Sequence, residues 1–265
     1  MGRATNWLAQ AREVNVSRLT PYDRHLAYRE DLLEVGPRFF MRTRLMRRML
    51  QGQRGRILDV GCGDGFFLAQ LAHMGFQCAG LDASEAMIER ARVRLAGQAE
   101  LFCGLIQDYT PDQPFDAVVC GEVLEHIEDD VGTLREVARV LRPGGVLVLS
   151  VPIDMRLWNE ADAYAGHVRR YTKGEILQKL RQAGFAPGSY VVWGFPITRA
   201  LHFRIRREQC NLMEGTARPG SRKLLRGLLA WARYLFLLDN LFNWTERGVG
   251  IVVKAIRNAG SPVTE

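Results

Sequence analysis

Acidic and imidazole side chains gather in two short segments that could carry out proton transfer. The first is Glu122-Val-Leu-Glu125-His126, with two carboxylates and one imidazole within five residues, and the second contains His167. Imidazole takes up and releases a proton near neutral pH more readily than any other side chain. The two segments predict a catalytic site, with His126, His167 and Glu122 as candidate catalytic residues. The alternatives are a metal site and purely structural histidines.

A glycine-rich turn precedes these segments and has the composition of a ligand-binding loop. Gly61, Gly63 and Gly65 follow an apolar run, and a glycine lets a ligand lie against the backbone because it has no Cβ. Asp82 ends the next apolar run, 21 positions after Gly61, where a carboxylate can accept both hydroxyls of a ribose. A dinucleotide fingerprint reads G-x-G-x-x-G, whereas the third glycine here comes one position early. The loop therefore predicts a nucleoside cofactor, and a dinucleotide is one of two competing interpretations.

Alternating apolar strands and amphipathic helices must position these residues. Strands are predicted over 56–61, 77–83, 99–106, 115–123, 146–152, 189–194 and 250–256. Helices are predicted over 66–74, from the cap Ser84 to Leu95, over 130–141, and from Thr172 to about Ala183, with Glu175 completing a capping box. This alternation predicts an α/β fold with a doubly wound parallel sheet, whose ligands bind at the carboxyl ends of the strands.

Two segments lie outside this pattern. Residues 1–53 are rich in arginine and predict an N-terminal helical extension, so the main domain is expected over 54–265. Residues 197–247 separate the last two strands and predict a helical cap inserted into that domain. Within it, the apolar stretch 224–244 is expected to pack on the sheet. The alternatives are a lid over an apolar substrate, a dimer interface and a membrane-docking surface.

Composition and charge narrow the classes of protein. The chain has 265 residues, 47% hydrophobic and 25% charged, which excludes a disordered or collagen-like chain. Its net charge of +7 suggests an anionic partner, and basic residues in the cap favour a lipid or another anionic surface. These basic residues are Arg199, Arg204, Arg206, Arg207, Arg222, Lys223 and Arg226.

Cysteine usage and the apolar runs suggest where the protein works. The five cysteines are an odd number without a C-x-x-C pair, as expected of reduced, buried residues. The first residues lack the apolar stretch of a signal peptide, and no run of about 18 apolar residues occurs. We therefore expect a soluble, cytoplasmic protein, a monomer or homodimer, with peripheral contact at the inner membrane face as the alternative.

The motifs together resemble class I S-adenosylmethionine-dependent methyltransferases over roughly residues 34–195. They are Asp59-Val-Gly-Cys-Gly-Asp-Gly65, then FDAVVCGEVLEH, then LRPGG, in the order that this family shows. The resemblance implies a Rossmann-like sheet of seven strands, mostly parallel with an antiparallel last strand, and S-adenosylmethionine as cofactor. It also implies the cofactor-binding residues Asp59, Gly61, Cys62, Gly63, Gly65, Asp82, Ala83, Met87, Leu105, Ile106, Cys120 and Gly121. Where the family often has an acidic residue, this chain has Leu105, so Gln107 or Asp108 would have to contact the adenine amino group.

A later segment, GHVRRYTKGEI, resembles a narrower bacterial group of these methyltransferases that is associated with glycan, lipid and secondary-metabolite pathways. The expected substrate-binding residues are Arg42, Arg169, Arg170 and Tyr171, the arginines forming a rim for an anionic acceptor. The alternative is that the arginines pair with acidic residues of the chain and that Tyr171 packs in the interior.

The E-x-x-E-H pattern resembles both polyprenyl-quinone O-methyltransferases and the metal-binding element of small-RNA 2′-O-methyltransferases. Mg²⁺ or Zn²⁺ is a possible but not favoured cofactor, with Glu122, Glu125, His126 and His167 as candidate ligands. The expected function is methyl transfer to a small-molecule, glycan or lipid-linked acceptor, most readily at oxygen. The alternatives are a metal-assisted RNA 2′-O-methyltransferase, although nucleic acid is not the expected partner, and a non-catalytic regulator that binds S-adenosylmethionine.

Overall fold

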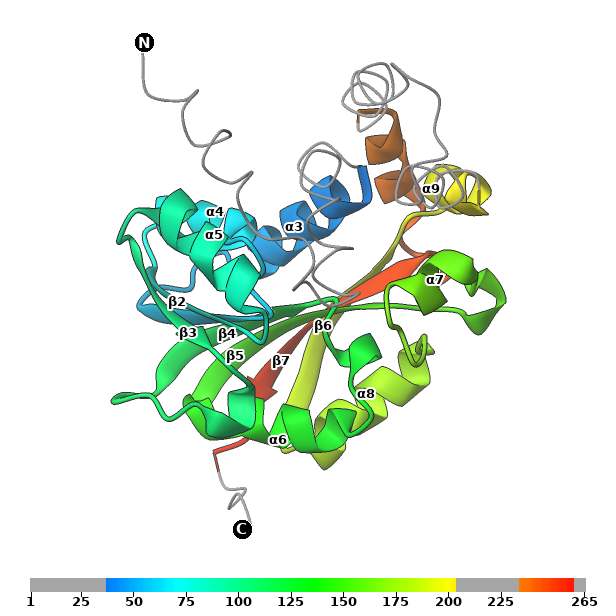
Figure 1. The fold of residues 1–265 in the computed structure, drawn as a ribbon. Coiled ribbons are helices and arrows are strands. Elements are labelled where there is room, and N and C mark those ends of the chain that lie inside the picture. Colours follow the sequence, from blue (N-terminus) through cyan, green and yellow to red (C-terminus); the bar gives the residue numbers. More distant parts are fainter. Residues whose placement is uncertain (1–36, 204–233, 260–265) are drawn as a thin grey trace, which may run out of the picture.

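A central seven-stranded sheet organises the molecule (Figure 1). The computed structural model describes residues 37–203 and 234–259. The strand order is β3-β2-β1-β4-β5-β7-β6, and only β7 runs antiparallel to its neighbours. The strands are β1 (Arg56–Val60), β2 (Gln77–Asp82), β3 (Ala99–Cys103), β4 (Phe115–Gly121), β5 (Leu141–Pro152), β6 (Phe185–Trp193) and β7 (Gly250–Arg257). This confirms the predicted mostly parallel sheet with an antiparallel last strand.

Helices cover both faces of the sheet (Figure 1). On one face lie α3 (Pro37–Met49), α4 (Phe66–His73) and α5 (Glu85–Leu95), and on the other lie α6 (Asp130–Val140) and α8 (Lys173–Gln182). Each helix turns an apolar stripe toward the strands, which produces two separate cores. The short helix α7 (Glu160–Tyr164) follows β5.

Local capping signals in the sequence correspond to the helix starts. Ser84 accepts a hydrogen bond from the Met87 N–H at 3.3 Å and so caps α5. Thr172 and Glu175 form both bonds of the predicted capping box at α8. The sequence analysis missed a second capping box, at α7, where Asn159 and Asp162 play these roles.

The segment between β6 and β7 is only partly described. Helix α9 (Ile197–Ala200) follows β6, and the 3₁₀ helix η6 (Phe236–Phe242) precedes β7. Residues 204–233 of the expected cap, residues 1–36 of the expected N-terminal extension and Cys210 lie outside the described residues, and the domain division stays a prediction. No described helix is long and apolar enough to span a membrane.

Candidate active site

The glycine loop connects β1 to α4 at the carboxyl edge of the parallel strands. Gly61, Gly63 and Gly65 all have positive φ angles, of 75°, 54° and 75°. A Cβ added at Gly61 would lie 2.4 Å from a methyl carbon of Val123, so this position excludes any side chain. At Gly63, by contrast, a Cβ would meet nothing within 4 Å. The loop is therefore packed tightly at its start and leaves open space above Gly63.

Asp82 is held rigidly at the end of β2. One carboxylate oxygen accepts the Gly63 N–H at 2.8 Å, and the other accepts the Ser84 N–H at 2.9 Å. The glycine loop and the predicted ribose-binding carboxylate thus form one bonded unit.

Asp59, at the end of β1, carries a buried carboxyl group. Burial raises its pKa to about 8, the nearby negative charge of Asp82 adds to this effect, and the positive charge of Arg42 opposes it. Asp59 is therefore mostly neutral at pH 7. A cationic ligand group placed beside it would favour the ionised form.

Glu122 follows β4 in the left-handed conformation, at φ 62°, which is unusual for a residue other than glycine. Its carboxylate accepts a hydrogen bond from the Ser150 hydroxyl at 2.9 Å and lies 3.5 Å from the Arg42 guanidinium. Burial by itself would raise the pKa of Glu122. The positive charges of Arg42 and Arg38 and the hydrogen bond from Ser150 have the larger combined effect, so the pKa of Glu122 is lowered. Glu122 is an anion engaged by Arg42, which places Arg42 of α3 beside the end of β4.

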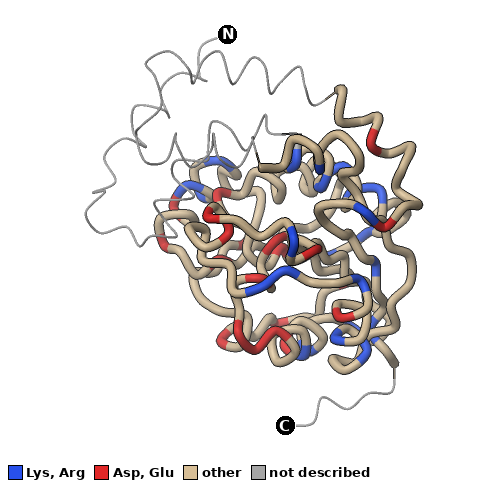
Figure 2. The backbone as a smooth tube through the Cα atoms, turned by 90° about the vertical axis from the view of Figure 1, so that its right-hand side faces the viewer, with Lys and Arg blue, Asp and Glu red and all other residues tan. Residues whose placement is uncertain are grey.

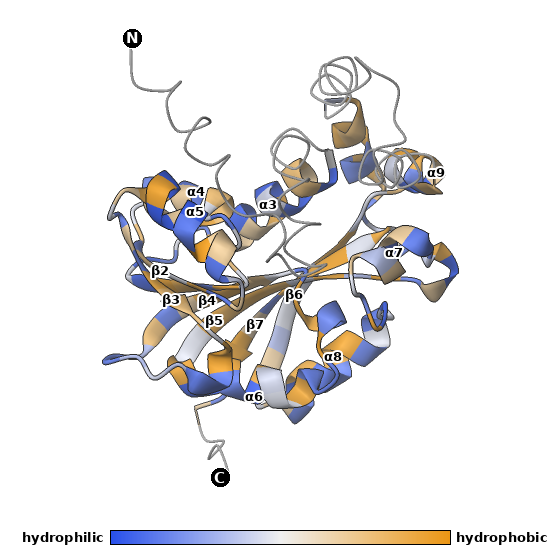
Figure 3. Ribbon diagram, viewed as in Figure 1, coloured by the Kyte–Doolittle hydropathy of each residue, from blue (hydrophilic) through white to orange (hydrophobic). Residues whose placement is uncertain are grey.

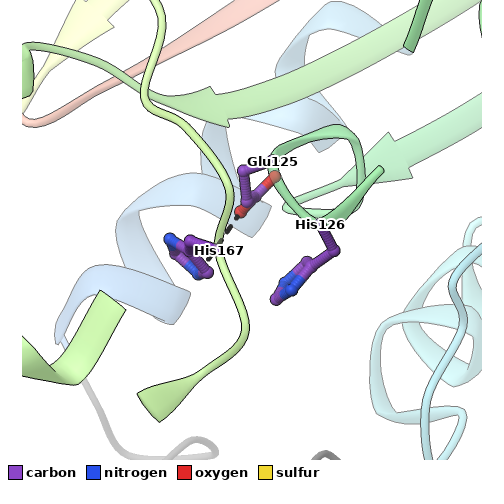
Figure 4. A group of neighbouring side chains, drawn as sticks. All are labelled: Glu125, His126 and His167. Atoms are coloured by element: carbon purple, nitrogen blue, oxygen red, sulfur yellow. Dashed lines mark ion pairs between the residues drawn. The ribbon is translucent and has the colours of Figure 1, made fainter. Parts of the chain in front are cut away.

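Glu125, His126 and His167 come together from two loops (Figure 4). The rings of His126 and His167 meet edge to face, with centroids 4.7 Å apart. Glu125 is fully buried, both of its carboxylate oxygens lack a hydrogen-bond partner, and one lies 4.0 Å from the His167 Nε2. Burial, and then the charge of Glu122, raise the pKa of Glu125 well above its usual range.

The buried ion pair of Asp162 and Arg170 lies against His167. The Asp162 carboxylate lies 3.3 Å from the His167 Nδ1 and is also bound by the Arg170 guanidinium, the shortest of these distances being 2.8 Å. The backbone joins the two loops as well, because the Val168 N–H donates to the Glu125 carbonyl at 2.8 Å. Sequence reasoning missed Asp162, and the only signal for it was its spacing of three residues from the helix cap Asn159.

The structure contradicts the expected anion-binding rim at two of its three arginines. Arg170 is buried against Asp162, and Arg169 pairs with Asp130 at 2.9 Å and with Glu128 at 3.2 Å. Their guanidinium groups are occupied by carboxylates of the chain, because burial of a guanidinium requires a paired anion. Tyr171 is also buried, and its hydroxyl lies 2.9 Å from the Asp130 carboxylate. These residues stabilise the loop that carries His167 and do not line an acceptor pocket.

The remaining expected cofactor-binding residues fall into two groups. Gly121 ends β4 close to Arg42, and Ala83 and Leu105 are exposed at the carboxyl edge. The side chains of Cys62, Met87, Ile106 and Cys120 are buried. Ile106 and Cys120 belong to the core, and a Cβ added at Gly80 of β2 would lie 2.9 Å from the Cys62 sulfur. Cys62 and Cys120 can therefore meet a ligand only through their backbone.

Comparisons with known proteins agree with this geometry. Residues 58–149 match the family described as a methyltransferase domain, from the middle of β1 to near the end of β5. Residues 58–149 thus correspond to a methyltransferase domain. Its sheet order, glycine loop and acid at the end of β2 are those of the class I S-adenosylmethionine-dependent type.

Curated relatives of this methyltransferase domain match only part of the chain. A ubiquinone biosynthesis O-methyltransferase of Xanthomonas campestris pv. campestris is 37% identical over 100 residues, 36% of this chain and 42% of the relative. A probable S-adenosylmethionine-dependent methyltransferase of Mycolicibacterium smegmatis is 32% identical over 131 residues, 49% of this chain and 51% of the relative. The chain thus spans about half or less of the length of these relatives.

Solved structures with the same fold have diverged further in sequence. Phosphoethanolamine N-methyltransferase 2 of Haemonchus contortus superposes with a TM-score of 0.61 at 17% identity, over 91% of this chain and 61% of that one. The [4+2]-cyclase SpnF superposes with a TM-score of 0.58 at 20% identity, over 82% of this chain and 81% of that one. These similarities establish the fold alone. Because a cyclase has the same fold, the fold does not identify the reaction, which has to be inferred from the residues of the site.

Proposed function

We propose that this chain transfers a methyl group from S-adenosylmethionine to an oxygen of a small-molecule, glycan or lipid-linked acceptor. The observation that carries the proposal is the cluster of His126 and His167 around the buried Glu125, just past the end of β4. A hydroxyl is a weak nucleophile until a base removes its proton, and this cluster supplies imidazoles for that task. The relative named for ubiquinone biosynthesis is also an O-methyltransferase, which supports transfer to oxygen.

The residues at the carboxyl edge fit the cofactor. The open space above Gly63 is the volume that a Cβ would occupy, and the positive φ of this residue favours glycine. Asp82 offers fixed acceptors for the ribose hydroxyls, and Asp59 lies where it can face the amino group of the methionine part. When bound, S-adenosylmethionine supplies a methyl group that is already activated by its positively charged sulfur.

The chain's own residues would activate the acceptor. The Asp162 carboxylate lies 3.3 Å from the His167 Nδ1, so its negative charge favours a proton on Nδ1, and in this proposal Nε2 would accept the proton of the hydroxyl. Arg170 keeps Asp162 ionised and in place. Arg42 and Glu122 hold α3 against the end of β4.

Methyl transfer itself is tested with purified protein, S-adenosylmethionine and a panel of phenols, sugars and carboxylic acids. We expect release of S-adenosylhomocysteine with at least one hydroxyl compound. Transfer to carboxylic acids alone, which react as carboxylates and need no base, would contradict a histidine base. Tight cofactor binding without transfer to any compound, including lipid extracts, would instead favour the regulatory alternative.

A metal-assisted version of the reaction is the second candidate. Ligand atoms of Glu125, His126 and His167 all lie within 4.8 Å of one another. Two imidazoles and a carboxylate suit Zn²⁺ or Mn²⁺ better than Mg²⁺. Glu122, the fourth ligand considered from the sequence, is directed to Arg42 and Ser150 and does not belong to this group.

Metal analysis separates the two versions. With an imidazole base, we expect purified protein to hold no stoichiometric Zn²⁺ or Mn²⁺ and to keep its turnover after treatment with EDTA. One equivalent of bound metal, together with a loss of turnover on EDTA treatment that Mn²⁺ or Zn²⁺ restores, would show that a metal centre and not an imidazole base activates the acceptor.

The raised pKa of Asp59 predicts proton release when the cofactor binds. At pH 7 a carboxyl group with a pKa of about 8 is about nine-tenths protonated, and it must ionise to pair with an ammonium group. We expect release of close to one proton per cofactor, and an affinity that rises about tenfold from pH 6 to pH 7. Calorimetry in buffers of different ionisation enthalpy measures the protons. Asp59→Asn should abolish the release, whereas Asp116→Asn, at the opposite edge of the sheet, should not.

A further inference from the structure

The segment after β3 lies beside the carboxylate that is proposed to bind the ribose. Cys103 at the end of β3 pairs with Asp82 at the end of β2, and the Gly104 N–H donates to the Asp82 carbonyl at 3.0 Å. The glycine loop follows β1 on the other side of β2, and the histidine cluster lies past the end of β4, the next strand beyond β1. A cofactor whose ribose contacts Asp82 and whose methyl group faces the histidines would therefore extend its adenine toward the end of β3.

Residues 104–109, which we call the β3 loop, are exposed on one side and anchored on the other. The loop contains the 3₁₀ helix η3 (Ile106–Asp108), and the side chains of Gln107 and Asp108 are exposed. Ile106 is buried in the core, and the ring of Tyr109 packs against the same core. Between them, an amide and a carboxylate can hydrogen-bond to the amino group and to a ring nitrogen of adenine. The exposed side of the loop thus has groups that can recognise this base.

The guanidinium of Arg139, in the last turn of α6, holds the β3 loop by its backbone. Its Nη2 donates to the Tyr109 carbonyl at 2.8 Å and to the Ile106 carbonyl at 3.2 Å. The Ile106 carbonyl also accepts the Tyr109 N–H at 3.3 Å, which closes the 3₁₀ turn. Glu136, three residues before Arg139, accepts a hydrogen bond from its Nε at 2.7 Å and so orients the guanidinium. Because the donor is charged, these bonds are stronger than bonds between neutral groups.

The helix that carries Arg139 is itself fixed to the sheet. Leu134 and Val137 of α6 are buried, and the helix has both hydrophobic and hydrophilic residues, as Figure 3 shows. Charged residues of both signs are interspersed over the described backbone in Figure 2, and Arg139 has its counterion, Glu136, on the same helix. Since Glu136 already neutralises the guanidinium, the bonds to the β3 loop serve to fix carbonyls that lie 30 and 33 positions earlier in the chain.

We propose that Arg139 is a positioning residue for the cofactor, which holds the β3 loop in the conformation that recognises adenine. This proposal rests on the proposed function, because it requires the ribose at Asp82. Arg139 acts through the backbone of the loop and through the side chains of Gln107 and Asp108, and does not itself contact the base. Without its bonds, the loop becomes ordered only when the cofactor binds, and the entropy cost of that ordering lowers the affinity.

The test compares two ligands that differ only in the base, S-adenosylhomocysteine and S-inosylhomocysteine. The second carries a carbonyl oxygen where adenine has its amino group, so a loop that recognises adenine must bind it more weakly. Calorimetry with full-length wild type should show a preference of about tenfold or more for S-adenosylhomocysteine. Arg139→Met keeps the aliphatic stem and removes the guanidinium. It should lower the affinity for S-adenosylhomocysteine about tenfold and reduce the preference to about twofold.

Two further variants make the result specific to the loop. Arg139→Lys keeps a positive charge that can bond one of the two carbonyls, so it should recover part of the preference. It also replaces Arg139→Met in the test if the melting temperature shows that the methionine variant is unfolded. The matched control is Arg142→Met, which removes an arginine that pairs with Asp116 at 2.7 Å. This control should keep both affinities within about twofold of wild type.

Three outcomes would overturn the role of Arg139. They are a wild type that binds both ligands equally, an Arg139→Met variant that keeps the full preference even if both affinities fall, and an equal loss of preference in Arg142→Met. The second outcome would assign Arg139 a purely structural role. All three leave the proposed function intact, since the wild type still binds S-adenosylhomocysteine. No binding of S-adenosylhomocysteine by the wild type would contradict the proposed function, and this inference with it.

Discussion

Replacing Asp82 by alanine is expected to weaken S-adenosylmethionine binding by about a hundredfold or more. Two hydrogen bonds from ribose hydroxyls to a carboxylate contribute about 1.5–3 kcal/mol each, and every 1.4 kcal/mol is tenfold in affinity. The Gly63 N–H also loses its acceptor at 2.8 Å, so the glycine loop loses the bond that fixes it to β2. Both effects act on the cofactor, and calorimetric titration measures their sum.

The matched control is Asp116→Ala. Asp116 lies at the start of β4, accepts the Arg56 N–H at 2.9 Å and pairs with Arg142 at 2.7 Å. Its removal should lower the melting temperature as Asp82→Ala does, because each substitution leaves a backbone N–H without its carboxylate. Cofactor affinity should stay within about twofold of wild type, since this end of the sheet is remote from the glycine loop. If Asp82→Ala also kept wild-type affinity, the ribose assignment would be wrong.

Local sequence signals predicted most of the fold because they act over a few residues. Apolar runs, the glycine loop and the caps at Ser84 and Thr172 each depend on neighbours within one turn or one strand. Strand β5 shows the limit of such signals, since it begins at Leu141, five residues before the predicted start at Val146. The R-P-G-G sequence is typical of a turn, yet Leu141 pairs with Phe115 across an irregularity in the ladder.

The candidate site was predictable in its residue types but not in its pairings. Arg42 and Glu122 meet although 80 positions separate them, and Arg169 reaches Asp130 across 39 positions. Which acid neutralises which arginine depends on how the loops fold back over the sheet, and an isolated sequence has no local signal for this. The segment GHVRRYT therefore suggested an acceptor-binding rim, whereas the structure turns Arg170 inward to Asp162.

The same folding back of the loops explains why His167 can serve as the base. The ion pair of Asp162 and Arg170 and the backbone bond from Val168 to Glu125 hold the imidazole against a buried carboxyl group. The neighbouring His126 is only partly buried, so it can contact an acceptor hydroxyl.

Substituting His167 by alanine is therefore expected to lower turnover with a hydroxyl acceptor by about a hundredfold or more, the usual contribution of a positioned base. His126→Ala should have a smaller effect, about tenfold, because contact with the acceptor contributes less than proton removal. Both variants should bind S-adenosylmethionine within about twofold of wild type, since the cofactor contacts lie on the glycine loop and β2. His73→Ala, which alters an exposed histidine on α4, is the matched control for loss of an imidazole.

The pH profile distinguishes a base from a merely structural histidine. In wild type, log(kcat) should rise with pH until the imidazole is neutral, since only the unprotonated Nε2 can accept a proton. His167→Ala should lose that rise, whereas a structural loss would lower turnover evenly and leave the profile in place. Wild-type turnover and an unchanged profile in His167→Ala would exclude His167 as the base. The same result in both histidine variants would exclude the metal-assisted reaction as well, since both histidines are among its candidate ligands.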